Sequence, residues 1–289
     1  MIEVHEMSYA YPGSKQPILQ DMNFQIGTGE IFGLLGPSGA GKSTTQKVLI
    51  GMLKDYTGSV KVLGGEIARS NRTFYEKIGV AFEFPNFYMR LTARENLQMF
   101  RTLYSVPTVE VNEALRWVSL EDYADRKVQD YSKGMKMRLN LARSLMHHPQ
   151  LLFLDEPTSG LDPTNAAHIK QLMIKQKEEG RTIVLTTHNM ALAEQLCDRV
   201  AFVVDGKIRL IDTPARLMKE AGQTQVEVKY AHEDGSVKAL HVPTHELSQH
   251  TQFHSIMNSH ELLSIHSHEM SLEQLFIRVT GRALHEAEQ

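Results

Sequence analysis

A glycine-rich segment early in the chain has the residue types of a phosphate-binding loop. It matches the pattern G-x-x-x-x-G-K-[ST] and consists of Gly36, Pro37, Ser38, Gly39, Ala40, Gly41, Lys42, Ser43 and Thr44. Glycines let the backbone curl until its N–H groups point at phosphate oxygens, the lysine adds a cation, and the serine hydroxyl can ligate Mg²⁺. The pattern requires a strand before the loop and a helix after it, which we expect at residues 30–35 and 42–53. The sequence therefore predicts that the chain binds a nucleoside triphosphate.

Two neighbouring carboxylates follow a second apolar segment, residues 151–154. Asp155 is placed to hold Mg²⁺ directly or through water, and Glu156 to accept a proton from a water that attacks the γ-phosphate. Proton transfer of this kind contributes about 10²–10⁴ in rate. A strand that simply ends in two solvated acids is the plainer interpretation, and it is less favoured beside a phosphate loop. The pair indicates hydrolysis as well as binding.

A third segment, residues 130–136, decides among the phosphate-loop ATPases. It resembles the LSGGQ-type signature of the nucleotide-binding subunits of ABC transporters, in the variant Ser132, Lys133, Gly134, Met135 and a following lysine. The Ser132 hydroxyl, the Gly134 amide and the positive end of an amphipathic helix that starts here make a second γ-phosphate receptor. Alone, these residues would more often be an N-capped helix. The order and spacing of all the motifs favour the family resemblance.

The resemblance assigns roles to further residues. Tyr11 looks like the aromatic side chain that stacks on adenine, although a tyrosine in a turn or edge strand is an open alternative. His188 follows residues 181–187, where the family keeps a histidine for the γ-phosphate; a lone histidine after a strand is otherwise structural. The family's D-loop is similar to Ser159, Gly160, Leu161 and Asp162. The implied cofactors are ATP and Mg²⁺, with Ser43, Asp155 and Glu83 on the metal.

Two residues depart from the family pattern. The family has glutamine at the loop that opens the helical subdomain, whereas this chain has Glu83. A carboxylate keeps an oxygen for Mg²⁺ but loses the amide donor and adds negative charge near the γ-phosphate. We therefore expect the Mg²⁺ contact to persist and the positioning of water to change. Lys133 replaces the first signature glycine, a milder change because Ser132 and Gly134 carry the phosphate contacts.

The resemblance covers about residues 1–215 and implies an α/β fold of the P-loop NTPase type. Its parts are a RecA-like parallel sheet, an antiparallel β-subdomain and a helical subdomain at about residues 84–145. Residues 2–8 and 20–26 alternate in polarity as half-buried antiparallel strands do, and residues 151–154 and 181–187 look like buried strands. Residues 91–145 have mostly helical spacing. We expect an ATPase domain at residues 1–219.

The same resemblance implies partners. Two subunits pair head to tail in the ATP-bound state, as a homodimer or a heterodimer with a related ATPase, with each ATP between one phosphate loop and the other signature. Transmembrane permease subunits on separate chains would dock on the helical subdomain around residues 84–101. Pro85, Phe87 and Tyr88 are candidate contacts, and a core role for Phe84 and Phe87 is equally open.

Residues 220–289 predict a small α+β domain of different composition. Residues 222–289 hold nine acidic and four basic side chains and nine of the 14 histidines. Alternation from Val226 and a turn at Asp234-Gly235 predict a hairpin, followed by a helix, a strand near residues 262–265 and a helix from Ser271. The histidine pairs 241/245, 250/254 and 266/268 have spacings that suit a metal, but a solvated polar face is favoured. Residues 270–282 resemble the closing segment of ATPase subunits from bacterial drug and antibiotic exporters.

Composition limits the remaining function classes. The 289 residues carry a net charge of −3, which gives no reason to expect a nucleic acid partner, and a single cysteine, which excludes an intrachain disulfide. No apolar stretch approaches the roughly 20 residues that cross a bilayer, and the first residues lack the features of a secretion signal. We expect a cytoplasmic protein, peripheral on the inner face of the cell membrane, that drives export of a substrate the sequence does not identify. The alternative, a soluble ABC ATPase in translation or DNA maintenance, usually needs tandem cassettes or a coiled-coil insertion.

Overall fold

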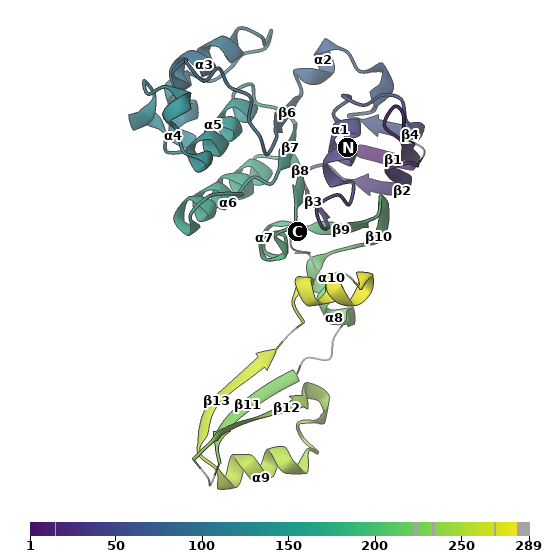
Figure 1. Cartoon of the computed structure of the whole chain (residues 1–289), viewed down its shortest axis with the longest axis vertical. Coiled ribbons are helices and arrows are strands. Elements are labelled where there is room, and N and C mark those ends of the chain that lie inside the picture. Colours follow the sequence, from purple (N-terminus) through teal and green to yellow (C-terminus); the bar gives the residue numbers. More distant parts are fainter. Residues whose placement is uncertain (15, 222–224, 233–234, 269, 282–289) are drawn as a thin grey trace. The chain divides into compact units, whose positions relative to one another are not determined.

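The computed structural model describes residues 1–14, 16–221, 225–232, 235–268 and 270–281 (Figure 1). Contacts divide the chain into two compact units, the first ending at Ile211 and the second beginning at Asp212. This division falls before the boundary expected near residue 220, because helix α8 (Pro214–Ala221) packs against α10 (Leu272–Thr280). Gly222 and Gln223, which mark the expected boundary, lie outside the described residues.

The first unit is built around a six-stranded sheet in the order β10-β9-β3-β8-β7-β6. The strands are β3 (Ile31–Leu35), β6 (Ile78–Ala81), β7 (Leu151–Asp155), β8 (Thr182–Thr187), β9 (Arg199–Val204) and β10 (Lys207–Asp212). Every residue of β3, β7 and β8 is buried, and these strands pair in parallel. Burial on both faces explains why these strands are mostly apolar and confirms the expected parallel sheet, whose carboxyl edge positions the site.

A second, antiparallel sheet has the order β2-β1-β4-β5. Its strands are β1 (Ile2–Tyr9), β2 (Leu19–Ile26), β4 (Thr57–Val62) and β5 (Gly65–Glu66). The side chains of β2 alternate between buried and exposed, which confirms the prediction from its polarity pattern. The buried face joins the core of the central sheet, where the rings of Phe24 and Phe32 stack with centroids 5.9 Å apart.

Helices surround the central sheet, with α3, α4 and α5 gathered on one side of it and the antiparallel sheet on the other (Figure 1). The helices of this unit are α1 (Lys42–Leu49), α2 (Arg72–Tyr75), α3 (Ala93–Arg101), α4 (Val111–Trp117), α5 (Lys133–Leu145), α6 (Pro163–Glu178) and α7 (Met190–Leu196). The expected helical region 91–145 is confirmed. Helix α1 ends four residues earlier than expected, because Gly51 adopts a left-handed φ of +76°. None of the described helices is long and apolar enough to cross a membrane.

The second unit contains a three-stranded antiparallel sheet and helix α9 (Thr251–Ser259). The sheet order is β12-β11-β13, from β11 (Gln225–Ala231), β12 (Val237–Pro243) and β13 (Leu262–His268). Val226, Val228, Tyr230 and Ile256 form the core between sheet and helix. The predicted hairpin is confirmed, although Asp234 of its turn lies outside the described residues. Within the described part of the chain, no three His, Cys, Asp or Glu side chains gather in a way that could hold a metal ion.

Candidate active site

The phosphate loop (residues 36–44) connects β3 to α1 at the carboxyl edge of the parallel sheet. Gly41 caps the N-terminus of α1 with φ +106°, a backbone conformation that favours glycine. A Cβ on Gly36 would lie 2.2 Å from the carbonyl oxygen of Val203 in β9, so a side chain there would displace the loop. The positive end of α1 faces the loop interior. This shape fits an anion held by backbone amides, as the phosphates of a nucleotide require.

A cavity of about 230 Å³ opens at this loop. It is lined by Ile18, Ser38, Gly39, Ala40, Gly41, Lys42, Ser43, Thr44, Glu83, Asp155, Glu156 and His188. Most residues that the sequence assigned to phosphate, metal and proton transfer therefore meet around one space. They come from distant segments and converge because the parallel strands end at the same edge.

Lys42 lies across the loop. Its ammonium group donates hydrogen bonds to the carbonyl oxygens of Gly36, at 2.7 Å, and Pro37, at 2.9 Å. Burial lowers the pKa of Lys42, and the neighbouring carboxylates, Glu156 foremost, act in the opposite direction. The result is a desolvated cation at the cavity whose present acceptors are neutral carbonyls, weaker partners than a phosphate oxygen.

Asp155 is a buried carboxylate at the end of β7. It accepts a hydrogen bond from the Thr186 hydroxyl and another, at 3.4 Å, from the Ser43 hydroxyl. Burial raises the pKa of Asp155, the two hydroxyls lower it, and Glu156 adds a further increase. Carboxylate and hydroxyl oxygens placed together are the ligand types that Mg²⁺ shares with substrate phosphates. The residues present therefore fit a magnesium nucleotide.

Glu156 follows Asp155 with a left-handed φ of +48°. For a residue other than glycine this conformation costs about 1–3 kcal/mol and tends to occur at functional sites. Its Oε1 accepts a hydrogen bond from the backbone N–H of His188 at 2.9 Å and lies 2.6 Å from Nδ1 of the same residue. Its Oε2 accepts a hydrogen bond from the Thr187 hydroxyl at 2.8 Å. Three groups thus fix the orientation of one carboxylate at the cavity.

Tyr11 lies beside the loop rather than in the cavity lining. Its hydroxyl is 3.4 Å from that of Thr44, and its ring meets Tyr9 edge to face with centroids 5.1 Å apart. The ring is 37% exposed, which leaves surface for a planar ligand. Glu83 does line the cavity, and its Oε1 lies 3.8 Å from the ammonium group of Lys133.

The signature segment (residues 132–135) lies against the D-loop (residues 159–162). Ser132 caps α5 by accepting the N–H of Met135 at 3.1 Å, which leaves its own O–H proton for another acceptor. A Cβ on Gly134 would lie 3.1 Å from the carbonyl oxygen of Gly160 and 3.0 Å from Leu161 Cδ2. Asp162 caps α6 by accepting the N–H of Asn165. The lining of this chain's phosphate cavity includes none of the signature residues.

Two threonines that the sequence patterns do not single out hold the carboxylates of Asp155 and Glu156. Thr186 and Thr187 end the segment expected to be a buried strand, and their hydroxyls donate to Asp155 and Glu156. Because β7 and β8 pair in parallel and in register, with Asp155 opposite Thr186, polar residues at both strand ends must meet. Hydroxyls at the end of an otherwise apolar strand were the available signal. Ile18 was also missed, since an apolar residue before a strand carries no signal of ligand contact.

Comparison with known proteins gives the same assignment. The family model described as ABC transporter matches residues 19–159. The fluoroquinolones export ATP-binding protein of Mycobacterium tuberculosis is 49% identical over 284 residues, covering 98% of this chain and 94% of the relative. The Nod factor export ATP-binding protein I of Rhizobium meliloti is 36% identical, covering 98% and 89%. The linearmycin resistance ATP-binding protein of Bacillus subtilis is 31% identical, covering 98% and 99%.

Solved structures agree. An ATP-binding subunit of an ABC transporter superposes with a TM-score of 0.69 at 30% identity, covering 76% of this chain and 92% of that one. A dimeric ATP-binding cassette in a post-hydrolysis state with ADP and Pi superposes with a TM-score of 0.67 at 26% identity, covering 74% and 98%. The predicted P-loop fold and the family resemblance are confirmed. The chain belongs to the ATP-binding subunits of ABC transporters, which are ATPases of the P-loop fold.

Proposed function

We propose that this subunit hydrolyses ATP to drive export of a drug-like or antibiotic compound through separate membrane subunits. The observation that carries the proposal is the Glu156 carboxylate, which Thr187 and His188 hold beside the phosphate loop. A merely nucleotide-binding protein has no need of a strained, oriented base at this point. The named substrates of the relatives, fluoroquinolones and linearmycin among them, support the substrate class.

The residues divide the reaction among them. The loop amides and Lys42 hold the β- and γ-phosphates, and Tyr11 stacks on the adenine. Bound Mg²⁺ would supply positive charge to the phosphates, held by Ser43, Asp155 and Glu83. Glu156 takes the proton of the attacking water, and His188 keeps the carboxylate oriented while its partly exposed ring reaches the γ-phosphate.

A second copy or a related ATPase would complete the site. The signature helix presents a hydroxyl, an amide and a helix N-terminus, yet it lies outside the phosphate cavity of its own chain. A head-to-tail pair would place each signature on the partner's nucleotide, an arrangement that dimeric relatives support. ATP would then join the subunits, and hydrolysis would release them.

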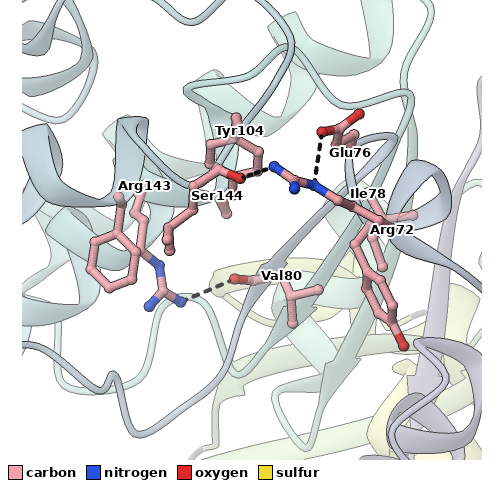
Figure 2. Close-up of a pocket in the computed structure, with 10 residues that line it drawn as sticks. Arg72, Glu76, Ile78, Val80, Tyr104, Arg143 and Ser144 are labelled. Atoms are coloured by element: carbon pink, nitrogen blue, oxygen red, sulfur yellow. Dashed lines mark hydrogen bonds and ion pairs between the residues drawn. The ribbon is translucent and has the colours of Figure 1, made fainter.

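The membrane partner would dock in a groove between the central sheet and the helical subdomain. Two cavities of about 330 and 530 Å³ share Phe100, Leu103 and Arg143. Arg143 lies on one side of the first cavity, donating to the Val80 carbonyl at 3.3 Å, and Arg72 lies on the other (Figure 2). Several large apolar side chains near the groove are exposed to solvent: Phe84 at 73%, Leu103 at 60% and Tyr88 at 58%. This groove would seat the subunit on the inner face of the cell membrane.

The sequence leaves a core role open for both Phe84 and Phe87, and the two side chains differ in exposure. Phe87 packs edge to face on Phe100, with centroids 6.1 Å apart, and its ring faces the Arg143 guanidinium at 5.4 Å. Its role is therefore at least partly structural. Phe84 is largely exposed and is the better contact for a partner. Pro85 is half-buried beside it.

A fractionation experiment tests the docking proposal. Phe84→Glu should move the subunit from the membrane fraction to the soluble fraction in cells of the source species, while the purified variant keeps its ATPase activity. Tyr123→Glu, at another exposed aromatic residue, is the matched control and should stay with the membranes. The alternative, a soluble ATPase without a transport role, predicts the same distribution for both variants and for the wild type. The relatives with export in their names favour transport over that alternative.

A further inference from the structure

We propose that Glu83 and Lys133, the two residues that depart from the family pattern, form one compensating charge pair, with Lys133 as a positioning residue for the phosphate cavity. The inference rests on the ATP site proposed above and deepens it. Its basis is that the fold brings the two departures together: the Lys133 ammonium group lies 3.8 Å from Glu83 Oε1. They are 50 residues apart in the sequence, Glu83 in the loop after β6 and Lys133 at the start of α5.

Each residue alone would put a charge in an unfavourable place. Lys133 is the first residue of α5, where the helix dipole disfavours a cation, and the first turn of this helix holds no acidic residue to offset it. Glu83 lines the phosphate cavity together with Asp155 and Glu156, where a third carboxylate opposes the approach of an anion. In the pair, the Glu83 carboxylate offsets the cation at the N-terminus of α5, and the Lys133 ammonium group offsets the additional negative charge at the phosphate cavity.

Lys133 also connects the signature segment to the D-loop. Its ammonium group donates to the Ser159 hydroxyl at 3.2 Å. A Cβ on Gly160 would lie 2.9 Å from Lys133 Cδ, so the lysine stem crosses directly over that glycine, whose φ is +72°. A glycine at position 133, as in the family pattern, would make none of these contacts. The pair therefore links the loop that faces this chain's own phosphates to the segment offered to the other chain's nucleotide.

The expected size of the effect follows from the exposure of the pair. The side chains are 56% and 31% exposed, so solvent and salt weaken their attraction. Ion pairs of this kind change an equilibrium constant by about 1.4- to 5-fold. We expect about threefold on the affinity for ATP, because the Glu83 charge that Lys133 offsets lies at the phosphates.

A double-mutant cycle on the purified full chain tests the pair by titration with ATP in EDTA at low salt. Lys133→Met keeps the unbranched stem over Gly160 and removes the charge together with the hydrogen bond to Ser159. It should raise the Kd for ATP about threefold in the wild-type background and by less than about 1.5-fold in the Glu83→Gln background. Salt at 0.5 M should shrink the effect in the wild-type background. Lys127→Met, at an exposed lysine that makes no ion pair among the described residues, is the control and should leave the Kd unchanged in both backgrounds.

Two results would overturn the pair. One is an increase in Kd of the same factor in both backgrounds, which would mean that Lys133 acts on the nucleotide independently of Glu83. The other is no change on Lys133→Met in the wild type. Thermal unfolding of each variant verifies folding, and Lys133→Gln repeats the cycle if the methionine variant does not fold. Failure of the wild type itself to bind ATP would refute the ATP site as well, so the two failures are distinguishable.

Discussion

Replacing Glu156 by glutamine separates its role as a base from its role in the structure. The variant keeps an oxygen that can accept the backbone N–H of His188, and its amide group can donate to the Thr187 hydroxyl, so the hydrogen bonds of the wild type have substitutes. The positive φ at this position remains, and no volume changes. What is lost is the proton acceptor. The expected loss of turnover is about 10²–10⁴-fold, equivalent to about 3–5 kcal/mol on the barrier.

The same variant should accumulate as an ATP-bound dimer. Binding of ATP uses the loop and Lys42, which the change leaves intact, and in the proposed head-to-tail pair dissociation would follow loss of the γ-phosphate. Size-exclusion chromatography with saturating Mg·ATP should show a dimer for Glu156→Gln and a monomer with ADP. Phosphate release measures turnover in the same samples. Glu178→Gln, at an exposed glutamate late in α6, is the matched control and should behave as the wild type.

Either of two outcomes would refute this reasoning. If Glu156→Gln turned over ATP at the wild-type rate, the carboxylate held by Thr187 and His188 would not be the base. If the variant stopped turnover but remained monomeric at saturating ATP, the base assignment would stand and the model of ATP as the link between two subunits would fall.

Three further predictions concern buried groups. Burial raises the pKa of Asp155, so above the unfolded pKa of about 4 the folded state disfavours the charged carboxylate. Asp155→Asn should therefore stabilise the nucleotide-free protein by about 0.5–2 kcal/mol in urea unfolding at pH 7. The same variant should lose Mg²⁺-dependent hydrolysis. Burial lowers the pKa of His147, whose Nε2 bonds the Ile78 carbonyl at 2.8 Å. The contribution of the neutral ring to the free energy of unfolding should therefore be full above about pH 6.5 and decline below it. His147→Gln should reduce the difference between unfolding curves at pH 7.5 and pH 5.5. Cys197 should resist a thiol reagent in the native protein and react only on unfolding, because burial raises its pKa and the residue is 8% exposed. Rapid labelling of the native protein would contradict this packing.

Much of the fold follows from the sequence because its patterns are local. The alternation in β2, the apolar run that leads to Asp155 in β7 and the β-branched and apolar residues of β8 indicate half-buried and fully buried strands before any tertiary contact is known. The pattern of the phosphate loop is also local, and Gly41 takes a positive φ within it, whereas the close backbone approach at Gly36 is to Val203 in β9. Contacts between distant segments are different. No pattern in the sequence shows that Thr186 lies opposite Asp155, because that depends on the register of two strands.

The pair of Glu83 and Lys133 is a second contact between distant segments that no pattern in the sequence shows. Taken singly, Glu83 suggests a changed positioning of water and Lys133 a milder change, because each is judged against the family residue at one position. Their meaning changes once the fold places them 3.8 Å apart, since the charge that each adds is offset by the other.

The unfavourable burial of charged groups at the phosphate cavity connects the stability of the protein with its function. Burial shifts the pKa of Lys42 downward and that of Asp155 upward, so both groups are held in charged forms that their surroundings disfavour. The carbonyls of Gly36 and Pro37 and the neighbouring carboxylates offset part of this cost for Lys42. The hydroxyls of Ser43 and Thr186, with Lys42, offset part of it for Asp155. A phosphate oxygen would pair with the Lys42 ammonium group and a divalent cation with the Asp155 carboxylate. A bound magnesium nucleotide would therefore offset both costs and stabilise the folded state by mass action. On this reasoning the unfavourable burial of charge is a source of affinity, and a variant that removes it, such as Asp155→Asn, should gain stability at the expense of Mg²⁺-dependent binding.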